Sequence, residues 1–583
     1  MCFGKSSLTY KVKQENMLER FLSYVKIESQ SIDEPDMSSF PMTDGQKAIA
    51  QHIYNEVKGF GGKNVKVTLS DDYYVYIDIP SNIKKKVPSI LFLAHLDVTP
   101  EAPGKGIKPI VHRNYNGGDI LLPAGITLSP NTPQGAHLKE LKGKTIVTSD
   151  GSTLLGADDK TGCAVLITMV EELIKNPKFK HGRVMVALSQ NEDVGKAALK
   201  YEPAVFGEKP DVVIDVDGDT YDQFSIANFS AIGQSYYFKG NKVHPSHGKE
   251  NKYADALTAA AYFIGLVPPE LNPSASEGTQ GYVHCYSMTH PLDEEGKPIT
   301  SDYVVKVRLR YFTQSDGDYQ KQLLTDNLRK TQGAFPFVEI KKTDDQTQYE
   351  NVGYSMPKYA PALIQKAAFD AGMEMRTKHA RGGTTSAMMV ARFPEEIPGG
   401  SDFYSGQNSE HSCYEWCCIE EMMQLVNAVE NMIKDLTDLD ISKEVSSIQT
   451  SSKRKQLTSL FAKAVNGTPL SIPLIEDSAP TYFLIPVSND DKNLCIDRLY
   501  FVDGTQKKFD YDRDIYQINS IKKRNNAHYA MVTRIKSKVN REFEIDGFLV
   551  HEIYMINRNK AKYKSNITIV EEKQYPFVEM VHP

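Results

Sequence analysis

Acidic residues and histidines flank the apolar segments of this 583-residue chain in a pattern that could bind metal ions. One pair directly follows each of the apolar runs 89–94 and 212–216, and another follows run 184–188 after three intervening residues. A fourth pair precedes the helix-like segment 163–174. Carboxylate oxygens and imidazole nitrogens are ligands that zinc and similar divalent metals take in proteins. The residues concerned are His95, Asp97, Asp158, Asp159, Glu192, Asp193, Asp217 and Asp219.

Each pair taken alone has an ordinary structural explanation. A His-x-Asp sequence after a strand is commonly a hydrogen-bonded pair, and acids before a helix complement its dipole. Acids beside a glycine form turns, and acids in a loop are usually solvated. The four pairs together argue against these explanations, because like charges gathered at one sheet edge are costly unless a cation neutralises them. The pattern therefore predicts one metal-binding crevice.

The elements that must position these residues are buried strands and helices. The runs 89–94, 184–188 and 212–216 are uninterrupted and apolar, as expected for parallel strands covered on both faces. Because they alternate with helix-like segments, we predict an α/β domain with a mostly parallel sheet. In such sheets, ligands bind beyond the carboxyl ends of the strands, where the four pairs lie.

The sequence pattern changes beyond residue 228. Strand-like pieces around a helix-like stretch predict an inserted α+β domain, and a polar, Ser-rich segment predicts a linker. Alternating strand-like runs then predict a β-rich accessory domain whose role and partner the sequence leaves unknown. The predicted division is 1–228 and 351–436 for the first domain, 229–350 for the insertion, 437–455 for the linker and 456–583 for the accessory domain.

Composition narrows the class of protein. The net charge is −6 and the seven cysteines are thinly spread, so neither a polyanion binder nor a disulfide framework is expected. No apolar run is long enough to cross a bilayer, and the start of the chain has no hydrophobic block. We therefore expect a cytoplasmic protein with no membrane partner. The basic residues of 522–541 accompany no nucleic-acid motif, so nucleic acid is not an expected partner.

A set of ordered motifs resembles one enzyme family. The chain from about 17 to 436 is similar to the peptidase T family, the tripeptide aminopeptidases among the zinc-dependent M20 metallopeptidases. The motifs that carry the resemblance are LERFLSYVKIESQS, FLAHLDVTP, GSTLLGADDKTG, NEDVGK, VDGD, GNKVHP, EGTQGY, RGGTTSA and SGQNSEH followed by YEW.

The resemblance implies a centre with two zinc ions (Zn2+), for which other divalent metals could substitute. Asp97 would hold a ligand imidazole in the correct tautomer, and Glu192 would be the general base for a metal-activated water. A cis peptide bond is also implied between Asp158 and Asp159. The implied ligands are His95, Asp158 and Asp217 for the first metal, and Asp158, Asp193 and His411 for the second.

The resemblance also gives the inserted domain a role as a lid. His244 would stabilise the developing oxyanion of the scissile bond. Arg310 and Arg381 would surround the short peptide substrate, with a guanidinium on its C-terminal carboxylate. Because such lids often pack against each other, a homodimer is allowed.

The chain departs from the family pattern at several pocket positions. Asp193 stands where a glutamate is usual, and Thr385 replaces an aspartate. Asp219 replaces a glycine, and Ser409 and Glu410 replace aromatic residues. Each change is compatible with metal binding, although Asp193 is one methylene shorter than the usual ligand of the second metal. Together the changes leave the peptide length and side-chain preference undetermined.

The leading expectation is thus a metal-dependent aminopeptidase that removes the N-terminal residue of tripeptides or short peptides. One alternative keeps the centre but changes the substrate: a dipeptidase, a carboxypeptidase or an N-acyl-amino-acid amidohydrolase. Another is an inactive scaffold that acts through the C-terminal domain. His411 with Cys413, Cys417 and Cys418 also suggests a Cys/His zinc site, but a second cysteine pair is missing and buried thiols fit better.

Overall fold

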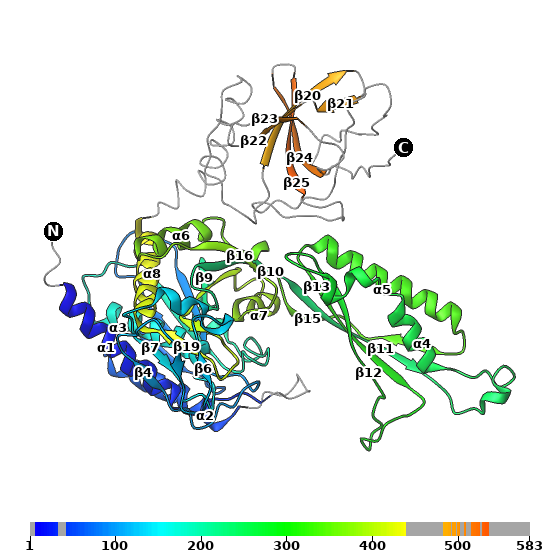
Figure 1. Ribbon diagram of the computed structural model, residues 1–583, viewed down its shortest axis with the longest axis horizontal. Helices are drawn as coiled ribbons and strands as arrows, with labels where there is room; N and C mark the ends of the chain where they lie inside the picture. Colours follow the sequence, from blue (N-terminus) through cyan, green and yellow to red (C-terminus); the bar gives the residue numbers. More distant parts are fainter. Residues whose placement is uncertain are drawn as a thin grey trace. The chain divides into compact units, whose positions relative to one another are not determined.

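The computed structural model describes residues 6–32, 42–438 and a set of strands between 482 and 535 (Figure 1). The chain forms two compact units, 1–441 and 442–583. The predicted linker 437–455 lies outside the described residues except for Thr437 and Asp438.

The first unit is built around an eight-stranded mixed sheet. Its inner strands β8, β3, β9 and β17 run parallel, whereas β2 and β10 pair antiparallel with β8 and β17. The predicted α/β class is confirmed, with more antiparallel pairing than expected. In sheet order the strands are β1 (Lys66–Leu69), β2 (Val75–Ile79), β8 (Val184–Ser189), β3 (Ile90–His95), β9 (Val212–Gly218), β17 (Gly400–Tyr404), β10 (Gln223–Asn228) and β16 (Arg376–Ala380).

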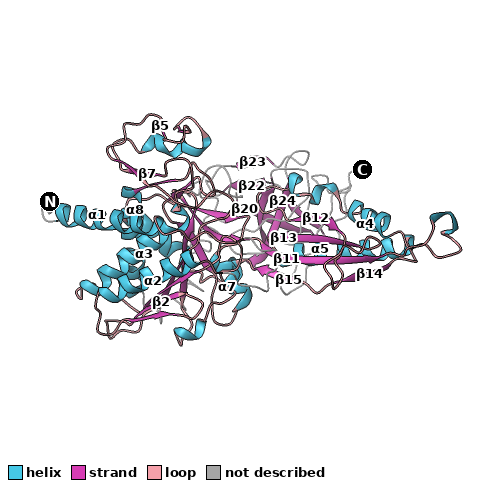
Figure 2. Ribbon diagram, turned by 90° about the horizontal axis from the view of Figure 1, so that it is seen from below, coloured by secondary structure: helices cyan, strands magenta, loops and turns pink. Residues whose placement is uncertain are grey.

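Helices cover both faces of this sheet, which explains why the central strands are apolar throughout. Phe92 belongs to the same buried cluster as the helices α1, α2, α3 and α8, whereas its neighbour Leu91 packs in a second cluster with α7. Figure 2 shows α1, α2, α3 and α8 on one side of the strands and α7 on the other. The helices are α1 (Ser6–Val25), α2 (Asp44–Gly59), α3 (Ala157–Lys175), α6 (Ala360–Asp370), α7 (Thr385–Arg392) and α8 (Ile419–Asp438).

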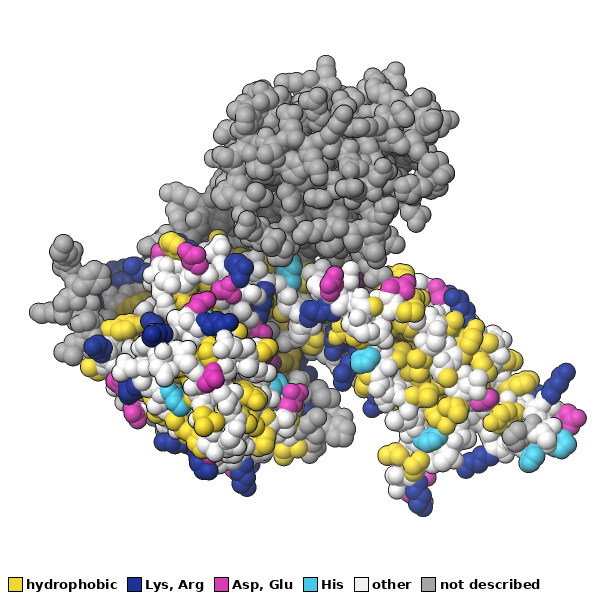
Figure 3. Space-filling view, viewed as in Figure 1, with side chains coloured by type: hydrophobic (Ala, Val, Ile, Leu, Met, Phe, Trp, Pro, Cys, Tyr) yellow, Lys and Arg dark blue, Asp and Glu magenta, His cyan; other side chains and the backbone are white. Residues whose placement is uncertain are grey.

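Residues 230–349 form a second sheet with a core of its own. The strands are antiparallel, and α4 (Ala256–Gly265) and α5 (Gln314–Ala334) pack on them through a cluster that includes Phe263 and Leu324. Hydrophobic side chains gather on the face of this segment seen in Figure 3. Leu257 and Tyr262 are among its exposed large hydrophobic residues. The strands are β12 (Tyr282–Thr289), β13 (Tyr303–Tyr311), β11 (Ser230–Lys239) and β14 (Glu339–Lys342), with β15 (Gln346–Tyr349) also paired to β11.

Shorter elements complete the first unit. A four-stranded sheet lies in the order β18 (Gln407–Asn408), β19 (Trp416–Cys418), β7 (Ile146–Thr148) and β4 (Ile110–His112), and β5 (Ile120–Leu121) pairs with β6 (Thr127–Leu128). The 3-10 helices are Pro133–Glu140, Pro203–Val205, Pro245–His247, Pro269–Leu271, Pro273–Ala275 and Val352–Tyr354.

The described part of the second unit is an antiparallel sheet. Its strands are β20 (Tyr482–Asp490), β21 (Asn493–Ile496), β22 (Arg498–Phe501), β23 (Gln506–Lys508), β24 (Ile515–Arg524) and β25 (Ala527–Ile535). Lys536, Lys538 and Arg541 of the basic segment lie outside the described residues. None of the helices in the described ranges is both long and apolar enough to span a membrane.

Candidate metal centre

The parallel strands bring three of the predicted acidic and histidine segments to one edge of the main sheet. His95 ends β3 and pairs in register with Ser189, the last residue of β8. Asp217 lies near the end of β9, the other neighbour of β3. Glu192 and Asp193 follow in the turn after β8.

Asp158 comes to the same edge from the start of α3. Gly156, at a φ of +77°, turns the chain into the helix, and the peptide bond between Asp158 and Asp159 is cis, as the resemblance implied. The Glu415 carboxylate holds this backbone, because it accepts hydrogen bonds from the N–H groups of Leu155 (2.6 Å), Gly156 (2.6 Å) and Asp158 (2.9 Å). The first turn of α3 is thus held from a distant part of the chain.

His411 lies on the loop between β18 and β19. Ser409 and His411 both have positive φ values, 56° and 57°, which non-glycine residues adopt rarely. The loop is tied down because the Ser409 hydroxyl donates to the Gln134 carbonyl (2.8 Å) and the Ser412 hydroxyl donates to the Ser409 carbonyl (2.6 Å). This conformation directs the imidazole toward Asp158.

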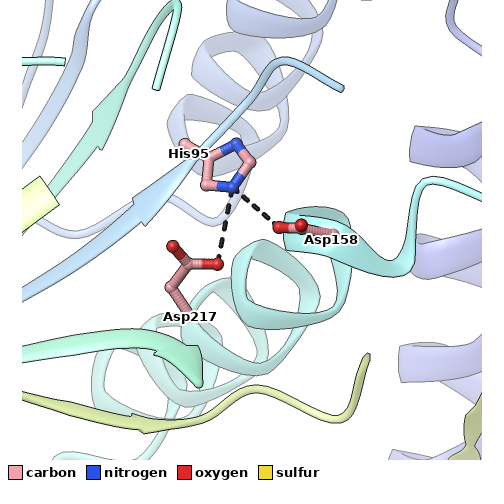
Figure 4. A group of neighbouring side chains, drawn as sticks. All are labelled: His95, Asp158 and Asp217. Atoms are coloured by element: carbon pink, nitrogen blue, oxygen red, sulfur yellow. Dashed lines mark hydrogen bonds and ion pairs between the residues drawn. The ribbon is translucent and has the colours of Figure 1, made fainter. Parts of the chain in front are cut away.

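Two groups of candidate ligands share Asp158. In the first, the His95 Nε2 atom lies 2.9 Å from Asp158 Oδ1 and 3.4 Å from Asp217 Oδ1 (Figure 4). In the second, the His411 Nε2 atom lies 3.2 Å from Asp158 Oδ2 and 2.9 Å from Asp193 Oδ1. Each oxygen of Asp158 therefore faces a different group, so this carboxylate would be able to contact an ion in each.

The residues present fit a pair of divalent cations. Within each group the ligand atoms lie within 4.8 Å of one another. The Oδ2 atom of Asp193 is buried and has no hydrogen-bond partner among the described residues. Burial raises the pKa of Asp217 well above its usual value and that of Asp193 to about 6. Cations at this position would offset the cost of burying these charges.

The pKa values of the two imidazoles, His95 and His411, depend on the same carboxylates. Burial lowers the pKa of His95, but Asp217 and Asp158 outweigh it and hold that pKa well above its usual value. Hydrogen bonds to Asp158 and Asp193 raise the pKa of His411 to about 12. These shifts favour protonated rings when no other cation is present, and metal binding would replace protons with ions of higher charge.

Asp97 links the first histidine to the turn after β8. One oxygen lies 3.4 Å from His95 Nδ1, and the carboxylate accepts hydrogen bonds from the N–H groups of Glu192 (3.0 Å) and Asp193 (3.2 Å). The Ser31 hydroxyl also donates to it at 2.5 Å. A Glu192 oxygen lies within 4.8 Å of ligand atoms of His95 and Asp193, and burial raises the pKa of Glu192 well above its usual value.

Three predicted site residues are not brought to this cluster. His244 is exposed, and its Nδ1 atom lies 2.7 Å from the Ser246 hydroxyl. Arg310 donates to Gln348 Oε1 within the second sheet (3.1 Å). Arg381 donates to the Gly278 carbonyl and the Ser276 hydroxyl, both at 2.7 Å.

Sequence reasoning missed two carboxylates that support the centre. Glu415 lies in the quoted motif YEW, but nothing in the local sequence predicts three backbone hydrogen bonds. Glu101, six residues after His95, has an oxygen 3.0 Å from His411 Nδ1. The groups of candidate ligands found in the described residues contain no cysteine, and Cys417 and Cys418 are buried.

Relatives of the chain are found by sequence and by structure, although no protein-family model matches. Peptidase T of Halothermothrix orenii is 33% identical over 433 residues, which cover 72% of this chain and 98% of the relative. Peptidase T of Bacillus pumilus is 30% identical over 421 residues, covering 71% and 97%. Crystal structures of the aminopeptidase PepT from Bacillus cereus and of a tripeptidase from Staphylococcus aureus match with TM-scores of 0.54 and 0.53. Each is 17% identical, covering 73% of this chain and 99% of the other, and so shows the fold.

The mixed sheet and its shared ligand groups define an α/β protein with a candidate two-metal centre. The chain belongs to the peptidase T family, which confirms the resemblance inferred from its motifs.

Proposed function

We propose that the protein is a metal-dependent aminopeptidase that removes the N-terminal residue of tripeptides or other short peptides. The observation that carries this proposal is the pair of ligand groups that share Asp158, with Glu192 beside them, in a chain related to peptidase T. The structural relatives include proteins described as an aminopeptidase and a tripeptidase.

Five residues would hold two zinc ions or similar divalent cations. His95 and Asp217 would bind one, His411 and Asp193 the other, and Asp158 would contact both. When bound, such a pair polarises the scissile carbonyl and lowers the pKa of a water. Nitrogen and carboxylate ligands suit zinc, and they also accept cobalt or manganese.

Glu192 would move the proton that peptide hydrolysis requires. An amide is a poor electrophile and its amine leaves only when protonated, so a base must take a proton from water and return it to the leaving nitrogen. Burial raises the pKa of Glu192 well above its usual value, which favours its carrying this proton between the two steps. Its backbone is bonded to the Asp97 carboxylate that also approaches His95, so the base and the ligand are held in fixed relation.

The inserted segment 229–350 would act as a lid. We expect it to bring His244 to the scissile carbonyl oxygen and Arg310 and Arg381 to the C-terminal carboxylate of the peptide. Because His244 does not contact the ligand cluster, this role requires a movement of the inserted domain or a second copy of the chain. Arg381 already links to the inserted segment through Ser276 and Gly278.

A substrate panel tests the proposal. Purified protein is incubated with a free tripeptide, the matching dipeptide and the N-acetylated tripeptide, before and after chelation and after addition of zinc. We expect release of the first residue of the free tripeptide, loss with chelator and recovery with zinc. Equal cleavage of the acetylated peptide would favour an amidohydrolase, and two bound metals without any cleavage would favour a scaffold.

A further inference from the structure

The two candidate ligand histidines are each backed by a different carboxylate. In both rings Nε2 faces the shared ligand groups, and Nδ1 points away from them. The Nδ1 atom of His95 lies 3.4 Å from Asp97, and that of His411 lies 3.0 Å from Glu101 Oε2. Of these two carboxylates, only Asp97 has a role that the family resemblance implies.

We propose that Glu101 is a positioning residue that orients His411 as a metal ligand. A carboxylate that accepts the Nδ1–H bond fixes the tautomer of a neutral imidazole, which leaves the Nε2 lone pair free to bind a cation. It also sets the rotation of the ring. The inference rests on the two-metal centre of the proposed function, but it does not depend on which peptide is cleaved.

His411 needs such a partner more than His95 does. The side chain of His95 is 1% exposed, so packing holds its ring, whereas that of His411 is 33% exposed. His411 also lies on a loop in the left-handed backbone region. Its ring orientation is therefore set chiefly by the groups bonded to its two nitrogens.

Glu101 can serve as this partner because its backbone is fixed. The Gln30 side-chain amide donates to the carbonyls of Thr99 (2.9 Å) and Ala102 (2.7 Å), which lie on either side of Glu101. The Glu101 N–H donates to the Thr99 hydroxyl (3.2 Å). Although the side chain of Glu101 is 69% exposed, no Lys or Arg of the described residues forms an ion pair with it. The carboxylate is thus available to His411.

Metal binding by full-length variants tests the proposal. Metal-free wild type, Glu101→Ala, Glu101→Gln and Glu101→Asp are titrated with Zn2+ and with Co2+ by calorimetry, and bound metal is counted by atomic emission. We expect Glu101→Ala to weaken one of the two metal positions about 10- to 100-fold and to leave the other unchanged. Glu28→Ala, which removes an exposed carboxylate of a neighbouring segment, is the matched control and should bind as wild type does.

The glutamine variant separates positioning from simple charge attraction. Its amide oxygen can still accept the Nδ1–H bond, so we expect a smaller loss than in Glu101→Ala. Equal losses in the two variants would overturn the positioning role in favour of a charge effect. Wild-type affinity in Glu101→Ala, equal weakening of both positions, or a wild type that binds fewer than two metals would also overturn it. A wild type that binds two metals but cleaves no peptide would refute the proposed function and leave this test intact.

Discussion

Asp158 is the residue on which the centre depends. Its two oxygens face different histidines, so its loss would affect both ligand groups, whereas the loss of Asp217 or Asp193 would affect one. Glu192 differs from all of these, because its proposed work is to move a proton rather than to hold an ion.

Glu192→Gln tests that distinction. The amide keeps the size of the side chain but cannot take a proton from water, so we expect kcat to fall about 10²- to 10⁴-fold. Metal content should stay at the wild-type value. Steady-state kinetics and atomic emission measure the two quantities, and Glu202→Gln, which changes an exposed acid farther along the same segment, serves as the control. An unchanged kcat in Glu192→Gln would refute its role as the base.

At the scale of elements, α1, α2 and α3 are joined by one buried guanidinium. The Arg20 side chain is 6% exposed and donates to Glu56 (2.7 Å) on α2, and to Glu171 (2.6 Å) and Thr168 (2.7 Å) on α3. Because Asp158 lies in the first turn of α3 (Ala157–Lys175), this contact helps to fix the helix that presents the shared carboxylate.

Arg20→Ala should therefore destabilise the first unit. Removing the guanidinium leaves the partly buried Glu56 without its cation and Glu171 with only Lys175 as a partner, for which we expect a loss of about 3 kcal/mol in the free energy of unfolding. Arg113→Ala removes an exposed ion pair with Glu15 of the same α1 and should cost less than about 1 kcal/mol. Chemical denaturation of both variants measures the difference, and equal effects would contradict this reading.

A second contact between elements should depend on pH. His137 lies 2.6 Å from Glu421 of α8, and although burial lowers its pKa, Glu421 outweighs that effect and the pKa is raised. A group whose pKa is raised on folding stabilises the protein below its unfolded pKa and loses this effect as pH rises through the folded value. His137→Asn should thus lower the unfolding temperature more at pH 6 than at pH 9. A constant difference across this range would argue against the ion pair.

How much the sequence could predict differs between elements. The apolar runs at 89–94, 184–188 and 212–216 predicted β3, β8 and β9, because strands covered on both faces must be apolar. Patterning could not find β16 (Arg376–Ala380) or the antiparallel pairing of β10, since these segments are short and partly polar. His411 and Glu101 come together through loop conformations stabilised by distant hydrogen bonds. Only the family motifs pointed to His411, and no local signal pointed to Glu101.

At the scale of the whole molecule, the described site lies entirely in the first unit. The relative from Halothermothrix orenii matches along 98% of its length but covers only 72% of this chain. The residues of the second unit are thus additional to the catalytic apparatus that we propose.

A chain that ends at Ile441 should therefore retain peptidase activity. Every proposed ligand, the proposed base and the inserted segment precede this position, so we expect kcat/KM for a tripeptide to stay within a few-fold of that of the full chain. Kinetics of the two purified proteins make the comparison, with circular dichroism as the check on folding. A folded but inactive 1–441 protein would show that the second unit takes part in catalysis.

The hydrogen bonds between the Glu415 carboxylate and the backbone beside Asp158 have a consequence for biosynthesis. The acceptor and the amides it binds are more than 250 positions apart, with the insertion between them. While the ribosome is still translating the insertion, neither Glu415 nor His411 has been synthesised. A nascent chain should therefore be unable to assemble the centre until translation of the first unit is almost finished, which would delay proteolytic activity until the fold is nearly complete.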